Sequence, residues 1–248
     1  MEDTSDSEPT IEARPHLPGG LPGGHAVIDA LRTIAKRHAP RLRGDALACF
    51  NYLCQEITRE VRRRIDRNEP VDTEFVARLD LDFATRYFDA VFADPAGTPL
   101  PESWRVLLVR RPALDVDTPR LATGGGNTHI SHDLADALLR MCRTLGRPFG
   151  DAEYADYQAI NQMFGEHIGR LREHCESRLQ RKLGAGVFAL VANAVGELTV
   201  VFARDAAWHR ARRLATLRKP APELDRARVA IDWQAAMVGR AVLDLPVI

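Results

Sequence analysis

The sequence predicts an all-α protein, a single-domain bundle of about eight helices packed around a central apolar helix. Apolar residues recur at i, i+3 and i+4 almost throughout the chain after residue 24, which is the period of an amphipathic helix. Neither a period-two alternation nor an Asn-Gly hairpin signal accompanies them. With 248 residues and 45% hydrophobic side chains, the chain suits one globular domain over 25–248.

The first half of the chain divides at turn residues. Residues 1–24 contain five acids and no lysine, and Pro-Gly-Gly occurs twice among them. We therefore expect a disordered N-terminal tail. An apolar stripe over 27–34 follows, then a helix from Asp45 to about Arg67. Asp72 is a good N-cap for a third helix, whose core face runs from Phe75 to Ala90. A Pro/Gly-rich loop, a short helix around Trp104 and an irregular stretch to residue 123 come next.

The second half predicts four longer helices. One begins near Asn127 and ends at Gly146, and another covers 151–183. Prolines 220 and 222 separate a helix over 187–217 from a last amphipathic helix over 223–243. Glu197 is the only charged residue in the largely apolar stretch 184–203, but a charge near mid-bilayer costs about 2.5–3.5 kcal/mol. We therefore interpret 187–217 as the central buried helix, without a membrane role.

The charge of the chain limits the partners that we expect it to bind, and its cysteines indicate a cellular compartment. The 34 basic residues, only three of them lysines, balance 34 acids, which argues against sequence-independent nucleic-acid binding. An excess of positive charge over 170–219 weakens that exclusion for one face. Four cysteines without CxxC spacing, and an N-terminus unlike a signal peptide, predict a cytoplasmic protein.

The segment around His129 is the first candidate site. Three glycines precede it, but the Gly-Lys-Ser/Thr ending of a phosphate loop is absent. Asn127 or Thr128 is expected to cap the helix, which places His129 in the first turn as a neutral imidazole. Asp133 lies one turn later on the same side, so the two form an oriented acid–base pair, two metal ligands, or merely a capping histidine beside a solvated acid. His132 is expected to be exposed.

Polar residues on two other helices are the next candidates. Asp80 lies close to an apolar stripe and in line with Tyr87, so it is either a structural partner or a second acid–base group. Arg86 is placed to form a weak surface pair with Asp82. On the late apolar helix, a polar stripe includes Glu197, whose pKa burial should raise unless a cation offsets it; its other members are Asn193, Arg204 and Trp208.

These residues carry a resemblance to a known family. The string from Leu79 to Tyr87 matches D-x-x-F-A-x-R-Y, and the string from Asn127 to Leu134 resembles N-A-H-I-N-x-D-L, with Thr128 and Ser131 as departures. Both motifs belong to a bacterial all-helical family of unknown function, and the similarity spans about residues 45–215. The resemblance implies an all-helical fold and a shared constellation that comprises Asp80, Arg86, Tyr87, Asn127, His129, Asp133, Asn161, Arg204 and Trp208. It implies no activity.

The sequence thus leads to a working hypothesis of a cytoplasmic small-molecule enzyme with a cavity between helices. Its catalytic candidates are His129, Asp133, Asp80 and Glu197, and its substrate-binding candidates are Asn127, Arg86, Tyr87, Asn161, Asn193, Arg204 and Trp208. Because no nucleotide fingerprint occurs, we expect cyclisation, isomerisation, elimination or hydrolysis without an organic cofactor, in the setting of specialised metabolism. Two alternatives stay open: a metal-dependent hydrolase with His129, Asp133 and Asp80 as ligands, and a non-catalytic ligand-binding or protein-interaction module.

Overall fold

A computed structural model describes residues 29, 32, 46–91, 100–110, 125–163, 188–217 and 222–244, and for 46–50, 53, 109–110 and 188–200 it describes the backbone alone. These residues are helical or lie in turns, and no strand occurs among them, so the predicted all-α class is confirmed. The expected tail over 1–24, the apolar stripe over 27–34, most of the loop after residue 91 and the continuation of the 151–183 helix beyond residue 163 lie outside the described residues.

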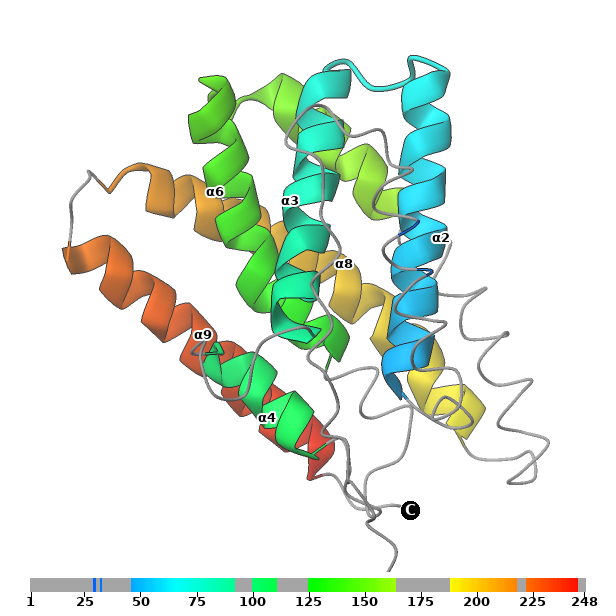
Figure 1. Ribbon diagram of the computed structural model, residues 1–248, viewed down its shortest axis with the longest axis vertical. Helices are drawn as coiled ribbons and strands as arrows, with labels where there is room; N and C mark the ends of the chain where they lie inside the picture. Colours follow the sequence, from blue (N-terminus) through cyan, green and yellow to red (C-terminus); the bar gives the residue numbers. More distant parts are fainter. Residues whose placement is uncertain are drawn as a thin grey trace, which may run out of the picture.

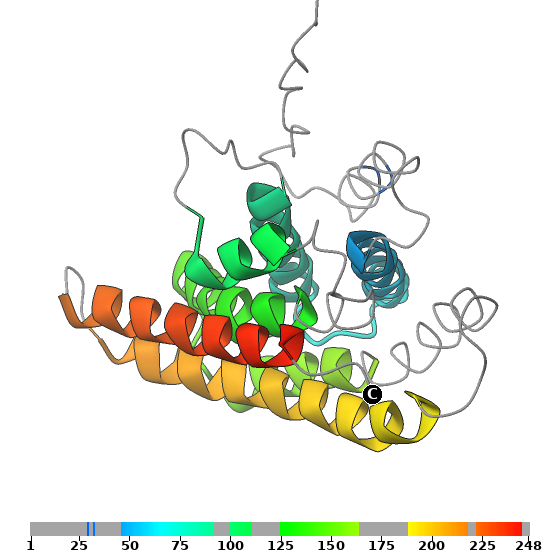
Figure 2. The same cartoon turned by 90° about the horizontal axis from the view of Figure 1, so that it is seen from below.

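The helices follow the order that the periodicity predicts. They are α2 (Ala46–Asp66), α3 (Thr73–Val91), α4 (Glu102–Arg110), the π-helical turn η1 (His129–Asp133), α6 (Leu134–Leu145), α8 (Phe188–Ala215) and α9 (Pro222–Leu243). Residues 125–128 and 151–163 are also helical. α2, α3 and α6 run side by side (Figure 1), α8 packs against α6, and α4 lies against α9 (Figure 2).

One hydrophobic core joins these helices. α3 contributes Phe75 and Leu79, and α6 contributes Leu134 and Leu138, each almost fully shielded from solvent. The apolar faces of α2, the 151–163 helix, α8 and α9 complete the same cluster. Removing this apolar surface from water is the main force that holds the helices together. The π-helical turn sits directly on this core through Ile130.

In the half of α8 whose side chains are described, one face is buried and the other is exposed. The sequence instead suggested a helix that is buried on all sides. Arg204, Ala207 and Trp208 are buried, but Val201 and Phe202 are exposed, Phe202 by 68%. The difference arises because, within the described part of the chain, α8 packs against α6, η1 and the 151–163 helix, and these leave Val201 and Phe202 uncovered. No helix in the described ranges is long and apolar enough to cross a bilayer.

Two predicted helix ends are confirmed in atomic detail. The Asp72 carboxylate accepts a hydrogen bond from the Phe75 N–H at 3.0 Å, the expected N-cap geometry of α3. Gly146 ends α6 with a φ of 61°, in the left-handed region, and its N–H bonds to the Arg143 carbonyl. The Arg147 N–H then reaches the Cys142 carbonyl at 2.9 Å, which completes the C-terminal motif.

We expect Gly146→Ala to lower the free energy of unfolding by about 1 kcal/mol, because a Cβ disfavours the left-handed conformation. Gly146→Asn should cost less, since asparagine adopts this conformation more readily. Urea denaturation followed by circular dichroism measures both changes. Equal stability of the wild type and the alanine variant would contradict the assigned cap.

Candidate functional site

The candidate site is built on an irregular turn within one long helix. Residues 125–128 are α-helical, His129–Asp133 form a π-helical turn, and α6 continues from Leu134. A π turn holds one more residue than an α turn and often marks a functional position. Both His129 and Asp133 are buried, with 3% and 2% of their surface exposed. Both side chains therefore lie inside the protein, whereas one alternative from the sequence was a capping histidine beside a solvated acid.

His129 and Asp133 form a direct hydrogen bond. His129 Nδ1 lies 2.8 Å from Asp133 Oδ2. The Phe83 ring stacks on the imidazole with a centroid distance of 3.6 Å and an interplanar angle of 9°. Because an ionised carboxylate only accepts, Nδ1 carries the proton and Nε2 is the basic nitrogen of the neutral ring. The geometry therefore matches an oriented acid–base pair rather than a capping histidine beside a solvated acid.

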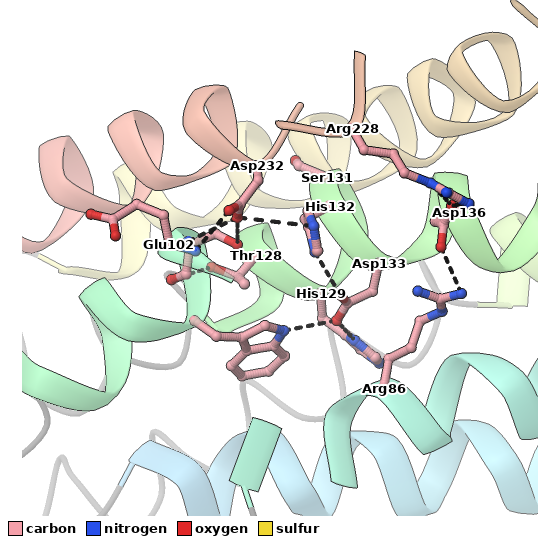
Figure 3. Close-up of polar contacts among 12 residues, drawn as sticks. Arg86, Glu102, Thr128, His129, Ser131, His132, Asp133, Asp136, Arg228 and Asp232 are labelled. Atoms are coloured by element: carbon pink, nitrogen blue, oxygen red, sulfur yellow. Dashed lines mark hydrogen bonds and ion pairs between the residues drawn. The ribbon is translucent and has the colours of Figure 1, made fainter. Parts of the chain in front are cut away.

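Two further donors fix the Asp133 carboxylate (Figure 3). The Trp104 indole N–H donates to Oδ2 at 3.0 Å, and His132 Nδ1 lies 2.7 Å from Oδ1. The expectation that His132 is exposed was wrong, because its side chain contacts the carboxylate of the next residue, Asp133, and is only 17% exposed. Both oxygens of Asp133 are thus engaged.

These contacts set the protonation states of the pair. Burial would raise the pKa of Asp133, but the hydrogen bonds from His129 and His132 together hold that pKa down at about 2. Burial lowers the pKa of His129 despite its bond to Asp133, and the nearby charges of Arg204 and Arg86 lower it further. At neutral pH the site therefore holds a carboxylate and a neutral His129 imidazole.

Asp80 lies in a separate polar group that includes Arg204. Burial raises the pKa of Asp80 to about 7, against the opposing effects of a Thr58 hydrogen bond at 3.5 Å and the charge of Arg204. The buried Arg204 guanidinium donates to Asn161 Oδ1 at 2.5 Å and lies 5.5 Å from the Tyr157 ring centroid. Asp80 lies three residues before Phe83, the ring that stacks on His129, so the two polar groups are connected through α3. The charge of Arg204 acts on the pKa values of both Asp80 and His129.

Arg86 pairs with Asp82 as predicted, but the pair is not a surface contact. Arg86 Nε lies 3.1 Å from Asp82, which is buried, and its Nη2 lies 2.9 Å from Asp136 on α6. Arg228 of α9 reaches the same Asp136 (Figure 3). Arg86 therefore links α3 to α6 beside the site while its charge still acts on His129.

Asn127 and Thr128 do not cap the helix as the sequence suggested. The helix already includes residues 125–128, and Thr128 makes no side-chain cap bond. Instead Asn127 donates to the Ala235 carbonyl of α9 at 3.1 Å, and Thr128 donates to the Ser103 carbonyl of α4 at 3.3 Å. Both residues thus tie the π-helical turn to its neighbours.

The remaining candidates fall into three groups. Tyr87 belongs to the site, because its ring centroid lies 6.0 Å from that of His129. Trp208 packs against the rings of Tyr157, Tyr154 and Phe149 and lines the core. Asn193 and Glu197 lie on the first half of α8, whose side chains are outside the described part of the chain.

Sequence reasoning left three contributing residues out of its site. The sequence predicted a short helix around Trp104 but gave this residue no place in the site. His132 had only its position beside Asp133, and Asp232 of α9, which faces His132, had none in the local sequence. Among the described side chains, no group of three His, Cys, Asp or Glu residues is arranged to hold a metal ion, and this gives no support to a site of His129, Asp133 and Asp80.

The fold and the site define an all-helical protein with a buried His–Asp pair in a π-helical turn. The chain belongs to the family of unknown function DUF5995, which matches residues 25–245. This confirms, at the level of the family, the resemblance inferred from the motifs around Asp80 and His129. A search of curated proteins and a search of solved structures found no match.

Proposed function

We propose that the protein is a small-molecule enzyme in which His129 exchanges a proton with the substrate and Asp133 orients the imidazole. The observation that carries the proposal is the buried 2.8 Å contact between His129 Nδ1 and Asp133 Oδ2 within the π-helical turn. A carboxylate that fixes the tautomer of a neutral histidine is the usual arrangement of a general base.

The cost of burying this pair favours a chemical role over a purely structural one. Apolar side chains of similar size often stabilise a core as well as or better than buried polar pairs do. Here the ring stacks on Phe83, and Trp104 and His132 both bond to Asp133. Several hydrogen-bond donors around one ionised acid are typical of sites that need a defined protonation state.

The second acid–base group in the proposal is Asp80, with Glu197 as the other candidate. A carboxyl group with a pKa of about 7 is able to give or take a proton at neutral pH, and Asp80 has this property. Arg204 and Asn161 next to it would bind a polar substrate. The reactions that need only these groups are cyclisation, isomerisation, elimination and hydrolysis, and we place them in cytoplasmic specialised metabolism.

Access to His129 requires an opened form, because only 3% of its surface is exposed. Burial of the pair in the closed form excludes water and strengthens the electrostatic interactions within the site. Opening and reclosure around substrate are common in enzymes and often limit turnover. The proposed reaction therefore includes a conformational step before the proton transfer.

The test is a comparison of metabolite conversion by the wild type and His129→Gln. Purified protein is incubated with a small-molecule cell extract, and mass spectrometry follows which compounds disappear. We expect at least one compound to be consumed by the wild type and to persist with the variant. Arg67→Gln is the control, since Arg67 is 66% exposed directly after α2. Identical extracts from all three incubations would overturn the proposal.

The proposed base also predicts the pH profile. Because burial lowers the pKa of His129 from its usual value of about 6.5, the limb of kcat/KM that reports His129 should lie below that pH, whereas Asp80 adds a second limb near pH 7. The unfolded chain binds this proton more readily, so His129 also reduces the stability of the fold as the pH drops below about 6.5. An acid limb above pH 6.5 that persists in the Asp80→Asn variant would contradict the assignment.

A second candidate function is ligand binding without chemistry. A surface hollow of about 610 Å³ on α8 is lined by Phe202, Asp205, Ala206, His209, Arg210 and Arg213. Three basic side chains and one phenyl ring there favour an acidic, partly apolar ligand. This alternative predicts that Arg213→Glu abolishes ligand binding while His129→Gln leaves it intact, which calorimetry with a ligand recovered from the extract would measure.

A further inference from the structure

Asp232 of α9 caps a helix to which it does not belong. Its Oδ2 accepts from the Glu102 N–H at 2.7 Å, and its Oδ1 accepts from the Ser103 N–H at 3.0 Å and the Ser103 hydroxyl at 2.6 Å. An N-cap acceptor normally comes from the residue that directly precedes the helix. Here it lies 130 residues further along the chain, so this one carboxylate fixes the first turn of α4 against α9.

The same carboxylate faces the candidate site. Asp232 Oδ1 lies 3.9 Å from His132 Nε2, and the other nitrogen of that ring lies 2.7 Å from Asp133 Oδ1. Asp232, His132, Asp133 and His129 therefore follow one another in an unbroken series (Figure 3). The first and last members come from helices that are distant in the sequence.

α4 provides a second route from Asp232 to Asp133. Trp104 follows directly after the two capped residues, and its indole N–H donates to Asp133 Oδ2 at 3.0 Å. The cap determines where the first turn of α4 lies, and that turn includes Trp104. The hydroxyl of Thr128 also bonds to the Ser103 carbonyl, which joins this turn to the residue next to His129.

We propose that Asp232 is a positioning residue of the His129–Asp133 site. By capping α4 and facing His132 it holds the two donors, Trp104 and His132, that orient the Asp133 carboxylate. Its importance for turnover rests on the proposed function, whereas the coupling itself is a property of the folded protein. A cap that only stabilised α4 would leave the His132 ring unaffected.

The test follows two nuclear magnetic resonance signals that need no substrate: the indole N–H of Trp104 and the titration of His132. Burial and the charge of Arg86 lower the pKa of His132, but the hydrogen bond to Asp133 and the charges of Asp133 and Asp232 outweigh them, so that the pKa is raised. Asp232→Asn should lower the His132 midpoint by at least about 0.5 pH unit. It should also shift the Trp104 indole signal.

Asp225→Asn is the matched control, because it removes an acid from the same helix at a position that is 81% exposed. Both signals should stay at their wild-type values there. If Asp232→Asn folds and leaves both signals unchanged, the proposal is overturned.

If Asp232→Asn does not fold, Ser103→Ala serves as the test of the proposal. This variant keeps the Asp232 charge and removes one bond to α4, so it should shift the Trp104 signal and leave the His132 midpoint in place. An unchanged Trp104 signal would overturn the proposal. These outcomes are separate from the metabolite test, since the coupling can fail while His129-dependent conversion persists, and the reverse holds equally.

Discussion

Asp133→Ala should lower the free energy of unfolding by about 3–5 kcal/mol, the usual cost of removing one partner from a buried polar cluster. The carboxylate accepts from Trp104, His129 and His132, and the substitution leaves all three donors without this acceptor in a buried site. Each such unsatisfied group costs about 1–3 kcal/mol. Urea denaturation at neutral pH, followed by circular dichroism, measures the loss.

Two comparisons make the Asp133 experiment specific. Asp66→Ala removes an acid that is 52% exposed and pairs with Arg62 on the same helix, so it should cost less than about 0.5 kcal/mol. Because the pKa of Asp133 is lowered to about 2, its stabilising effect is present above about pH 4 and is lost as the pH falls toward 2. The stabilities of wild type and Asp133→Ala should therefore approach one another in acid. Equal costs for Asp133→Ala and Asp66→Ala would show that the cluster does not stabilise the fold.

The helices were predictable because their signals are local. The apolar period along α3 and the acid that precedes it specify both the buried face and the N-terminus, and Asp72 makes the expected cap. Gly146 likewise marks the end of α6 by its freedom to adopt a positive φ. The spacing of His129 and Asp133 was local too, and it correctly predicted that they lie on one side of the helix.

The environment of the pair was not predictable, because it depends on departures from regular geometry and on distant segments. A helical wheel assumes a constant rotation per residue, so it misses the π-helical turn that buries His129 and draws His132 to Asp133. The Trp104 bond to Asp133 spans 29 residues, and the Asp232 cap spans 130. Nothing in the local sequence encodes contacts of this length.

His129→Gln should reduce turnover of the identified substrate by about a hundredfold or more, the typical contribution of a positioned acid–base group. The glutamine amide is still able to donate to Asp133, so the fold should lose less stability than in Asp133→Ala. We expect the loss in kcat with little change in KM, because the interaction that disappears acts mainly in the transition state. Steady-state kinetics beside urea denaturation separates the two effects.

The control for His129→Gln is Arg67→Gln, which should leave kcat within about twofold of the wild type, as expected for a side chain that is 66% exposed and lies outside both the His129 site and the hollow on α8. The stacked position of His129 on Phe83 adds a further check: Phe83→Leu keeps the base and loosens its ring, so it should lower kcat less than His129→Gln. A larger loss of kcat in His129→Gln than in Phe83→Leu is the order that we expect if the imidazole itself transfers the proton. If His129→Gln converts substrate as fast as the wild type, the His–Asp pair is structural, and the hollow on α8 becomes the place to look for the ligand.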